Sequence, residues 1–260
     1  MHRRTLPAMI AVLLLVAACG SGTGKRSTTT PAAGPVVTGT VTVFAAASLT
    51  ESFSTLATKF EAAYPGVHVK LDFGASSALA LQITQGAPAD VFASASAKNM
   101  AQVVDARAAS DPTTFARNEM EIAVPPANPA GVTGVADLAK SGVKVALCQS
   151  QVPCGATAQE VFARAGVTVR PVTLEPDVKA ALTKVRTDEV DAAVVYVTDV
   201  RAAGAKVKGI EIPDGQNAST DYPIAVLAKA GNPTGGRAFA DFVLSPTGRD
   251  VLAAAGFAAP

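Results

Sequence analysis

The most informative stretch of this chain for its fold is residues 40–51, which read TVTVFAAASLTE. Its first part, residues 40–45, is a β-branched run that predicts a strand. Ser48 and Glu51 then have the spacing of a capping box, which predicts that a helix begins here. This helix would carry an apolar stripe made of Leu49, Phe53, Leu56 and Phe60. A strand that runs directly into a helix is the building unit of α/β proteins.

The same alternation of strand and helix patterns continues along the chain. Further strands are expected within residues 67–73, 88–93, 120–124, 143–147, 190–196 and 222–228. Further helices are expected near residues 78–86, 97–107, 134–140, 155–164, 178–186 and 234–244. This order predicts an α/β fold with largely parallel sheets, both faces of which are covered by helices.

Composition and charge exclude several classes of protein. With 49% hydrophobic and 17% charged residues, the 260-residue chain has the make-up of a globular protein and is long enough for two lobes. Its 22 Lys and Arg residues nearly balance 21 Asp and Glu residues and form no basic block, so no nucleic-acid partner is expected. The absence of Trp also argues against sites that stack sugars or bases.

The first 18 residues have the pattern of a secretory signal peptide. Arg3 and Arg4 precede an apolar stretch, residues 6–18, that is too short to remain as a membrane span. The small residues before Cys19 resemble a bacterial lipobox, which implies cleavage before Cys19 and lipid attachment to its sulfur. A plain signal peptide with an incidental cysteine is the alternative. Removing residues 1–18 would change the formal net charge from +1 to −1, since it removes two arginines and no acid.

Export has consequences for residues further along the chain. Residues 19–39 are expected to form the lipidated cysteine and a flexible tether, because they are rich in Gly, Ser and Thr. A disulfide between Cys148 and Cys154 is expected, because an exported protein meets oxidising conditions and six residues can close a small loop. No direct metal ligands are expected, since His68 is the sole histidine after the signal peptide and alternates with apolar neighbours on the polar face of a strand.

The residue patterns indicate a binding protein rather than an enzyme. The sequence has no Gly-x-Ser-x-Gly elbow, no His-Glu-x-x-His and no phosphate-binding loop, and no histidine is placed as a catalytic base. Small or hydroxyl residues instead recur where strands meet helices, at residues 45–48, 74–77, 153–156 and 176–178. Helix starts offer unpaired N–H groups that bind anions, although each of these residues could also be a simple helix cap.

Four segments together resemble the periplasmic molybdate-binding proteins of ATP-driven importers. They are residues 43–50 (VFAAASLT), 73–79 (FGASSAL), 86–92 (GAPADVF) and 194–199 (VVYVTD). The similarity spans nearly all of residues 40–260 in matching order. It implies a type II periplasmic binding protein fold, in which two α/β lobes are joined by two hinge strands and close over a cleft.

The resemblance also implies lobe boundaries and a set of ligand-binding residues. With hinge crossings near residues 120–124 and 222–226, the first lobe would hold residues 40–121 and 224–260, and the second residues 122–223. Residues assigned to the oxyanion are Ser48, Ser76, Cys154, Val178 and Tyr196, with Ser77 as an additional candidate. The serines would donate through hydroxyl and backbone N–H groups, positions 154 and 178 through backbone N–H groups, and the tyrosine through its phenol.

The function implied is that of a lipid-anchored, monomeric receptor on the extracytoplasmic face of the cell membrane. It would capture molybdate, and also tungstate, without a cofactor, and would deliver the ion to a permease with cytoplasmic ATPase subunits on separate chains. The nearest alternative is the same fold binding sulfate or another tetrahedral oxyanion. An anchored serine hydrolase that uses Ser48 or Ser76, and a purely structural surface lipoprotein, are the alternatives from other classes.

Overall fold

The computed structural model describes residues 36–260. The expected signal peptide, the expected lipid attachment at Cys19 and most of the expected tether lie outside the described residues. Strand β1 (Gly39–Ala46) already begins at the last residue of that tether, where Gly39 N donates to Gly66 O at 2.8 Å. Strand β1 therefore begins one residue earlier than the strand that the sequence predicts.

Within residues 36–260, nine strands form one sheet of mixed direction, and eight of them follow one another along a single hydrogen-bonded path. Along that path they are β2 (Val67–Gly74), β1, β3 (Val91–Ala93), β9 (Ser219–Val226), β4 (Thr113–Val124), β7 (Ala192–Tyr196), β5 (Val145–Cys148) and β6 (Thr173–Glu175), while β8 (Lys208–Glu211) pairs with β4. Strand β1 is parallel to β2 and β3, and β5 is parallel to β6 and β7. The expectation of largely parallel sheets is wrong for β4 and β9, which are antiparallel to all of their partners. Strands β1, β2 and β3 form a first group, and β5, β6 and β7 form a second group. The chain leaves the first group on β4 and returns to it on β9, so these two strands run in opposite directions.

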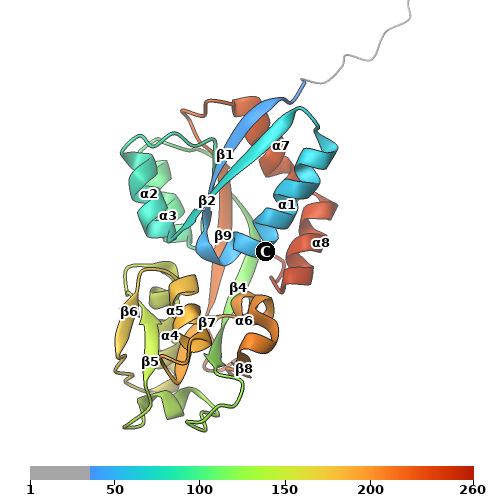
Figure 1. Ribbon diagram of the computed structural model, residues 1–260. Coiled ribbons are helices and arrows are strands. Elements are labelled where there is room, and N and C mark those ends of the chain that lie inside the picture. Colours follow the sequence, from blue (N-terminus) through green and yellow to red (C-terminus); the bar gives the residue numbers. More distant parts are fainter. Residues whose placement is uncertain (1–35) are drawn as a thin grey trace, which may run out of the picture. The chain divides into compact units, whose positions relative to one another are not determined.

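Helices cover both faces of the strands, as the sequence predicts. The α-helices are α1 (Thr50–Ala63), α2 (Ser76–Thr84), α3 (Ala97–Asp105), α4 (Pro153–Ala165), α5 (Val178–Arg186), α6 (Val197–Ala203), α7 (Pro233–Leu244) and α8 (Pro246–Ala255). Short 3₁₀ turns are η1 (Ala47–Leu49), η2 (Val135–Ala139) and η3 (Gly204–Lys206). Figure 1 shows α2 and α3 on one side of β1 and β2, and α1, α7 and α8 on the other. Within residues 36–260, no helix combines the length and the apolar character needed to cross a membrane.

The buried side chains form separate hydrophobic cores around the two groups of strands. In β1, Val41, Val43 and Ala45 face a core with α1 and α7, while Phe44 faces a second core with α2 and α3. This alternation follows from the two-residue period of a strand. A third core surrounds β5 and β7 and includes Leu182 of α5. Helices thus bury both faces of the first group of strands, and the second group has a core of its own.

Strand β4 connects these cores because it changes partners along its length. Residues 113–119 pair with β9, and residues 120–123 pair with β7. On the return path, Ala218 packs in the core around β7, whereas Tyr222 packs in the core with α1. On this path the change from one core to the other falls between residues 218 and 222, and β9 pairs with β3 and β4. The hinge crossing expected near residues 222–226 stays a prediction.

The local prediction at the start of α1 also needs correction. Ser48 does not form a capping box, because the 3₁₀ turn η1 comes between β1 and the helix. The Thr50 hydroxyl bonds to Ala47 O at 2.6 Å, and the Ser48 hydroxyl lies 2.8 Å from the Tyr222 hydroxyl. The helix expected over residues 134–140 is the 3₁₀ turn η2. The extra turn at η1 turns Ser48 away from the helix end and into the protein.

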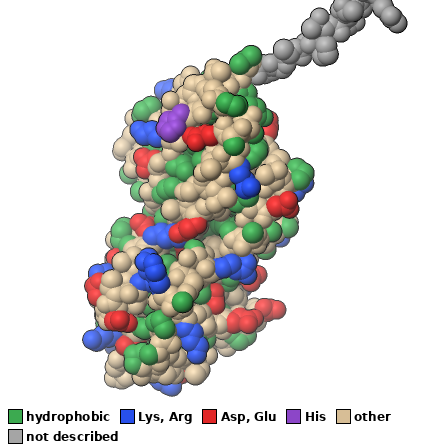
Figure 2. All heavy atoms as spheres, turned by 45° about the vertical axis from the view of Figure 1, so that its right-hand side comes forward, with side chains coloured by type: hydrophobic (Ala, Val, Ile, Leu, Met, Phe, Trp, Pro, Cys, Tyr) green, Lys and Arg blue, Asp and Glu red, His purple; other side chains and the backbone are tan. Residues whose placement is uncertain are grey.

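Charged side chains of both signs are mixed on the face of the molecule drawn in Figure 2. Figure 2 shows Lys and Arg side chains interspersed with Asp and Glu side chains over the face that it draws. This mixture agrees with the near balance of basic and acidic residues in the sequence. The face drawn has no single-sign patch that would attract a polyanion.

Candidate functional site

A small cavity lies where several helix starts meet. Its lining comes from both groups of strands and consists of Ala46, Ala47, Ser48, Gly74, Ala75, Ser76, Ala95, Val152, Pro153, Cys154, Asp177, Val178 and Tyr196. The structure thus brings together all five residues that the sequence assigns to an oxyanion. Ser77 instead lines a neighbouring, larger cavity of about 440 Å³ together with Lys98 and Ser150. Of the two adjacent serines, Ser76 is the one that lines the small cavity.

Two buried serines line the cavity from the first group of strands. Ser48 follows β1, and Ser76 is the first residue of α2. The Ser76 hydroxyl oxygen accepts a hydrogen bond from Ala95 N at 2.9 Å, which leaves its own proton free to donate. The first helical hydrogen bond of α2 runs from Leu79 N to Ala75 O. The N–H groups at the start of α2 that precede Leu79 therefore have no acceptor within the helix. This part of the wall presents hydrogen-bond donors and the positive end of a helix dipole.

Two more helix starts line the cavity from the second group of strands. Cys154 is the second residue of α4, and Val178 is the first residue of α5. Asp177 caps α5 by accepting a hydrogen bond from Ala180 N at 3.0 Å. This cap does not use the N–H of Val178. The backbone N–H groups of these two helix starts are donors of the kind that bind anions.

A disulfide fixes the start of α4. It joins Cys154 to Cys148, the last residue of β5. The next residue, Gly155, approaches the backbone so closely that an added Cβ would lie 2.0 Å from Gln149 O. Because only glycine fits such an approach, the loop between strand and helix holds the N–H of Cys154 in one place.

Tyr196 adds a buried hydroxyl without a partner. It is the last residue of β7, is 1% exposed and lines the cavity. Within residues 36–260, no group meets hydrogen-bond geometry with its Oη atom, although the side chains of Thr157 and Tyr222 lie near it. Burial raises the pKa of the Tyr196 phenol well above its usual value, so the group stays protonated and can donate. An unsatisfied buried hydroxyl costs about 1–3 kcal/mol, and a ligand that accepts its hydrogen bond would remove that cost.

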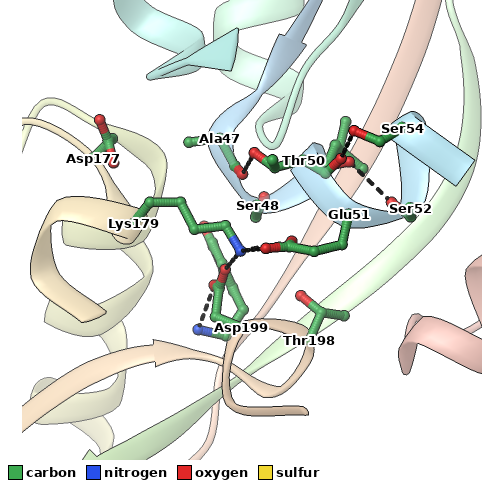
Figure 3. A network of polar contacts seen from close by, with 12 residues as sticks. Ala47, Ser48, Thr50, Glu51, Ser52, Ser54, Asp177, Lys179, Thr198 and Asp199 are labelled. Atoms are coloured by element: carbon green, nitrogen blue, oxygen red, sulfur yellow. Dashed lines mark hydrogen bonds and ion pairs between the residues drawn. The ribbon is translucent and has the colours of Figure 1, made fainter. Parts of the chain in front are cut away.

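A charged network lies beside the cavity (Figure 3). Lys179 Nζ lies 2.7 Å from Glu51 Oε2 on α1 and 3.0 Å from the fully buried Asp199 Oδ1 on α6. Burial alone would lower the pKa of Lys179, but Asp199 and Glu51 together raise it above its usual value. Asp199 also accepts a hydrogen bond from Tyr196 N at 3.2 Å. The charge of Lys179 is thus already paired with two carboxylates. The one charged residue in the lining of the cavity is Asp177, which caps α5, and no Lys or Arg lines it.

Sequence reasoning missed this network for a simple reason. The residues Glu51, Lys179 and Asp199 lie far apart in the chain, and each is an ordinary charged residue in the first turn of a helix. Only the packing of α1, α5 and α6 brings them together. The one local sign of this network in the sequence is that Lys179 directly follows the proposed contact Val178.

The hydroxyls in the cavity lack the partners that a serine nucleophile needs. Ser48 contacts Tyr222, and Ser76 accepts from a backbone N–H. His68 lies on β2 with its side chain 75% exposed and its Nδ1 atom 3.1 Å from Glu61. Within residues 36–260, no group of three or more His, Cys, Asp or Glu residues could hold a metal ion. The arrangement suits binding through hydrogen bonds.

Comparison with known proteins defines the class to which this chain belongs. Residues 41–258 match the family model of the bacterial extracellular solute-binding proteins, and the chain belongs to this family, whose members bind solutes and are not enzymes. The chain is 39% identical over 244 residues to the molybdate-binding protein ModA of Mycobacterium tuberculosis (strain ATCC 25618 / H37Rv), a match that covers 94% of this chain and 92% of that protein. This match confirms the resemblance carried by the four sequence segments.

Solved structures share the fold at lower sequence identity. The periplasmic molybdate-binding protein of Azotobacter vinelandii has a TM-score of 0.75 at 20% identity, and the match covers 85% of this chain and 99% of that chain. The sulfate-binding protein SubI of Mycobacterium tuberculosis H37Rv has a TM-score of 0.72 at 20% identity, and the match covers 84% of this chain and 86% of that chain. The mixed α/β fold is therefore that of periplasmic binding proteins.

Proposed function

We propose that this protein captures molybdate, and also tungstate, outside the cytoplasm and delivers it to the permease of an ABC transporter. The observation that carries this proposal is the buried, unpartnered Tyr196 hydroxyl in a cavity formed by helix starts. The similarity to molybdate-binding proteins along nearly the whole chain supports the choice of ligand.

The chemistry of the cavity suits a tetrahedral dianion. The proposed donors are Ser48, Ser76, Cys154, Val178 and Tyr196. Aligned N–H and O–H dipoles in a cavity shielded from water stabilise an anion without a counter-ion. A charge-assisted hydrogen bond contributes about 1.5–3 kcal/mol, so five or more can account for sub-micromolar affinity after the costs of closure.

We also propose that the two groups of strands act as lobes that close over the ion. The change of partners in β4 and the change of core on the return path support hinge crossings at about residue 119 and at about residue 219. The first lobe would then hold residues 40–119 and 219–260, and the second residues 120–218. Two observations support closure in this sense: residues of both groups line the cavity, and Lys179 on α5 is paired with Glu51 on α1. Closing around the ligand would mark the loaded receptor for its membrane partner.

The sequence before residue 36 supports attachment to the membrane. A signal peptide followed by Cys19 in a lipobox would leave a lipid on the cysteine and a flexible tether between membrane and receptor. The receptor would work as a monomer on the extracytoplasmic face. Its permease and ATPase subunits would be separate chains.

Sulfate is the second candidate ligand, because a sulfate-binding protein shares the fold and because sulfate has the same charge and shape as molybdate. Calorimetric titration of the chain from residue 20 onward with molybdate, tungstate, sulfate and phosphate separates the candidates. We expect tight binding of molybdate and tungstate and weak binding of the other two. Sulfate binding as tight as molybdate binding would contradict the choice of ligand, and no binding of any oxyanion would contradict the receptor function.

A further inference from the structure

We propose that Lys179 permits an anion to bind in the cavity by compensating the buried negative charge of Asp199. Neither residue lines the cavity, so Lys179 would act through Asp199, as a positioning residue that never touches the ligand. This inference rests on the proposed function, because it concerns the affinity of the same cavity for its anion.

The first step is the place of the Asp199 carboxylate. Its side chain is 0% exposed and lies in the first turn of α6. Its Oδ2 atom accepts a hydrogen bond from Tyr196 N at 3.2 Å, and Tyr196 lines the cavity. A buried negative charge is therefore held against the backbone of a residue in the wall of a proposed anion site.

The second step is that this charge acts on groups at the cavity. Burial is the main cause that raises the pKa of the Tyr196 and Tyr222 phenols, and the Asp199 carboxylate raises both further. Tyr196 lines the cavity, and Tyr222 Oη lies 2.8 Å from Ser48 Oγ. Buried charges are poorly screened by water and salt. An uncompensated Asp199 would therefore repel a dianion in the cavity.

The third step is that Lys179 supplies the compensating charge. Its Nζ atom lies 3.0 Å from Asp199 Oδ1, an oxygen that forms no hydrogen bond of standard geometry within residues 36–260. Burial raises the pKa of Asp199, and the Lys179 ammonium lowers it. Burial lowers the pKa of Lys179, and Asp199 is the largest of the causes that raise it. Each group thus helps the other to keep its charge in a buried place.

Two other carboxylates near the cavity differ from Asp199 in their contact with water. The Glu51 side chain is 52% exposed, so water screens its charge. Asp177 lines the cavity, but it is partly exposed and accepts a hydrogen bond from Ala180 N. Of these three carboxylates, Asp199 is the one that is sealed from water, and its charge is the one that needs Lys179.

The network gives Lys179 two roles that can be separated by substitution. Figure 3 shows its ammonium group between Glu51 and Asp199. Lys179 and Asp199 both lie in the second proposed lobe, on α5 and α6, whereas Glu51 lies on α1 in the first. The pair with Glu51 favours closure, and the pair with Asp199 removes a repulsion whether or not the lobes are closed.

The test is a double-mutant cycle with molybdate, measured by calorimetric titration at a mildly alkaline pH that favours charged carboxylates. Lys179→Met leaves Asp199 uncompensated, and we expect it to weaken binding about thirtyfold or more. Asp199→Asn removes the charge but keeps an oxygen that can accept from Tyr196 N. We expect the double variant Lys179→Met, Asp199→Asn to bind within about fivefold of the wild type, because neither charge remains.

Two single variants serve as controls. Glu51→Gln removes the contact between the proposed lobes and keeps the pair of Lys179 with Asp199, so it should weaken binding by less than about fivefold. Lys70→Met makes the same change of net charge at an exposed site on β2 and should leave the affinity unchanged. Circular dichroism shows whether each variant is folded.

Recovery in the double variant separates compensation from a structural role. If Lys179→Met binds as the wild type does, or if the double variant binds no better than Lys179→Met, the inference is wrong. If Lys179→Met does not fold, Asp199→Asn and the double variant still decide: they should bind within about fivefold of each other, and a larger gap would contradict the inference. If the wild-type protein does not bind molybdate, the proposed function itself fails.

Discussion

Tyr196 has a hydroxyl that is fully buried and lacks a hydrogen-bond partner within the described residues 36–260. Such groups are rare in native proteins, because the lost hydrogen bonds to water are not replaced. A cavity lined by helix starts provides a reason for this one, since an anion bound there would accept the missing bond. The residue is therefore better explained by a ligand than by stability.

This explanation makes a prediction with two opposite parts. We expect Tyr196→Phe to weaken molybdate binding by about 1 kcal/mol or more, or at least about fivefold, because one donor is lost. The same change should leave the ligand-free protein as stable as the wild type or more stable, because an unpaired buried hydroxyl disappears. Calorimetric titration and urea unfolding without ligand measure the two effects. The change Tyr64→Phe, at a site away from the cavity, serves as control, and a large loss of stability in Tyr196→Phe would show that the hydroxyl is structurally satisfied.

Among the secondary-structure elements, the start of α4 is the one most strongly constrained by covalent structure. The disulfide joins the end of β5 to the start of the helix, and Gly155 packs on Gln149 O. These features fix the N–H of Cys154, which we propose as a donor. An ordered donor loses less entropy when a ligand binds.

Removal of the disulfide should therefore affect both stability and binding. We expect the double variant Cys148→Ser, Cys154→Ser to lose about 2 kcal/mol in the free energy of unfolding, as expected for a short loop. Molybdate affinity should fall with it, although the backbone N–H at position 154 remains. Thiol treatment should reproduce both effects in the wild type and change nothing in the double variant. Full affinity in the double variant would mean that the donor is held by the backbone alone.

The elements that the sequence predicted well are those with a strong local pattern. Residues 178–186 were expected to be helical and form α5 with the same bounds, because an aspartate cap precedes a clear apolar stripe. Strand β6 was missed because it is short and leaves Leu174 55% exposed, so it lacks the expected alternation. Helix α8 was missed because it begins directly after α7, with Ser245 ending one helix and capping the next.

The cavity shows the same division between local and distant signals. Helix starts with small residues could be found in the sequence, and all five proposed contacts line one cavity. The partner of Ser48 could not be found, because Tyr222 lies 174 residues away in the chain. The pairing of β9 with β3 and β4 has the same character, since it joins segments that lie far apart in the chain.

For the whole molecule, the contact between α1 and α5 should influence how long a ligand stays bound. Glu51 and Lys179 belong to different proposed lobes, and opening would separate them. Asp199 would remain beside Lys179, because α5 and α6 lie in the same proposed lobe. The pair is thus a contact that favours the closed arrangement specifically.

We expect Glu51→Gln to raise the dissociation rate of molybdate about twofold to fivefold, which is the usual effect of a partly exposed ion pair. Stopped-flow displacement measures this rate. Asp72→Asn changes an exposed carboxylate on β2 and should have no effect. If both variants release molybdate at the wild-type rate, the pair does not contribute to closure.

The overall charge of the molecule leads to a prediction about salt. The mature chain would carry a net charge of −1, and Lys179 beside the cavity is already paired with Glu51 and Asp199. Long-range attraction of a dianion should therefore be weak, and binding should depend on buried dipoles that salt screens poorly. Raising the ionic strength from about 0.05 M to about 0.5 M should change molybdate affinity by less than about threefold. A steep loss of affinity over this range, measured by titration at several salt concentrations, would show that unpaired cations attract the ligand and that neutral donors alone do not explain its binding.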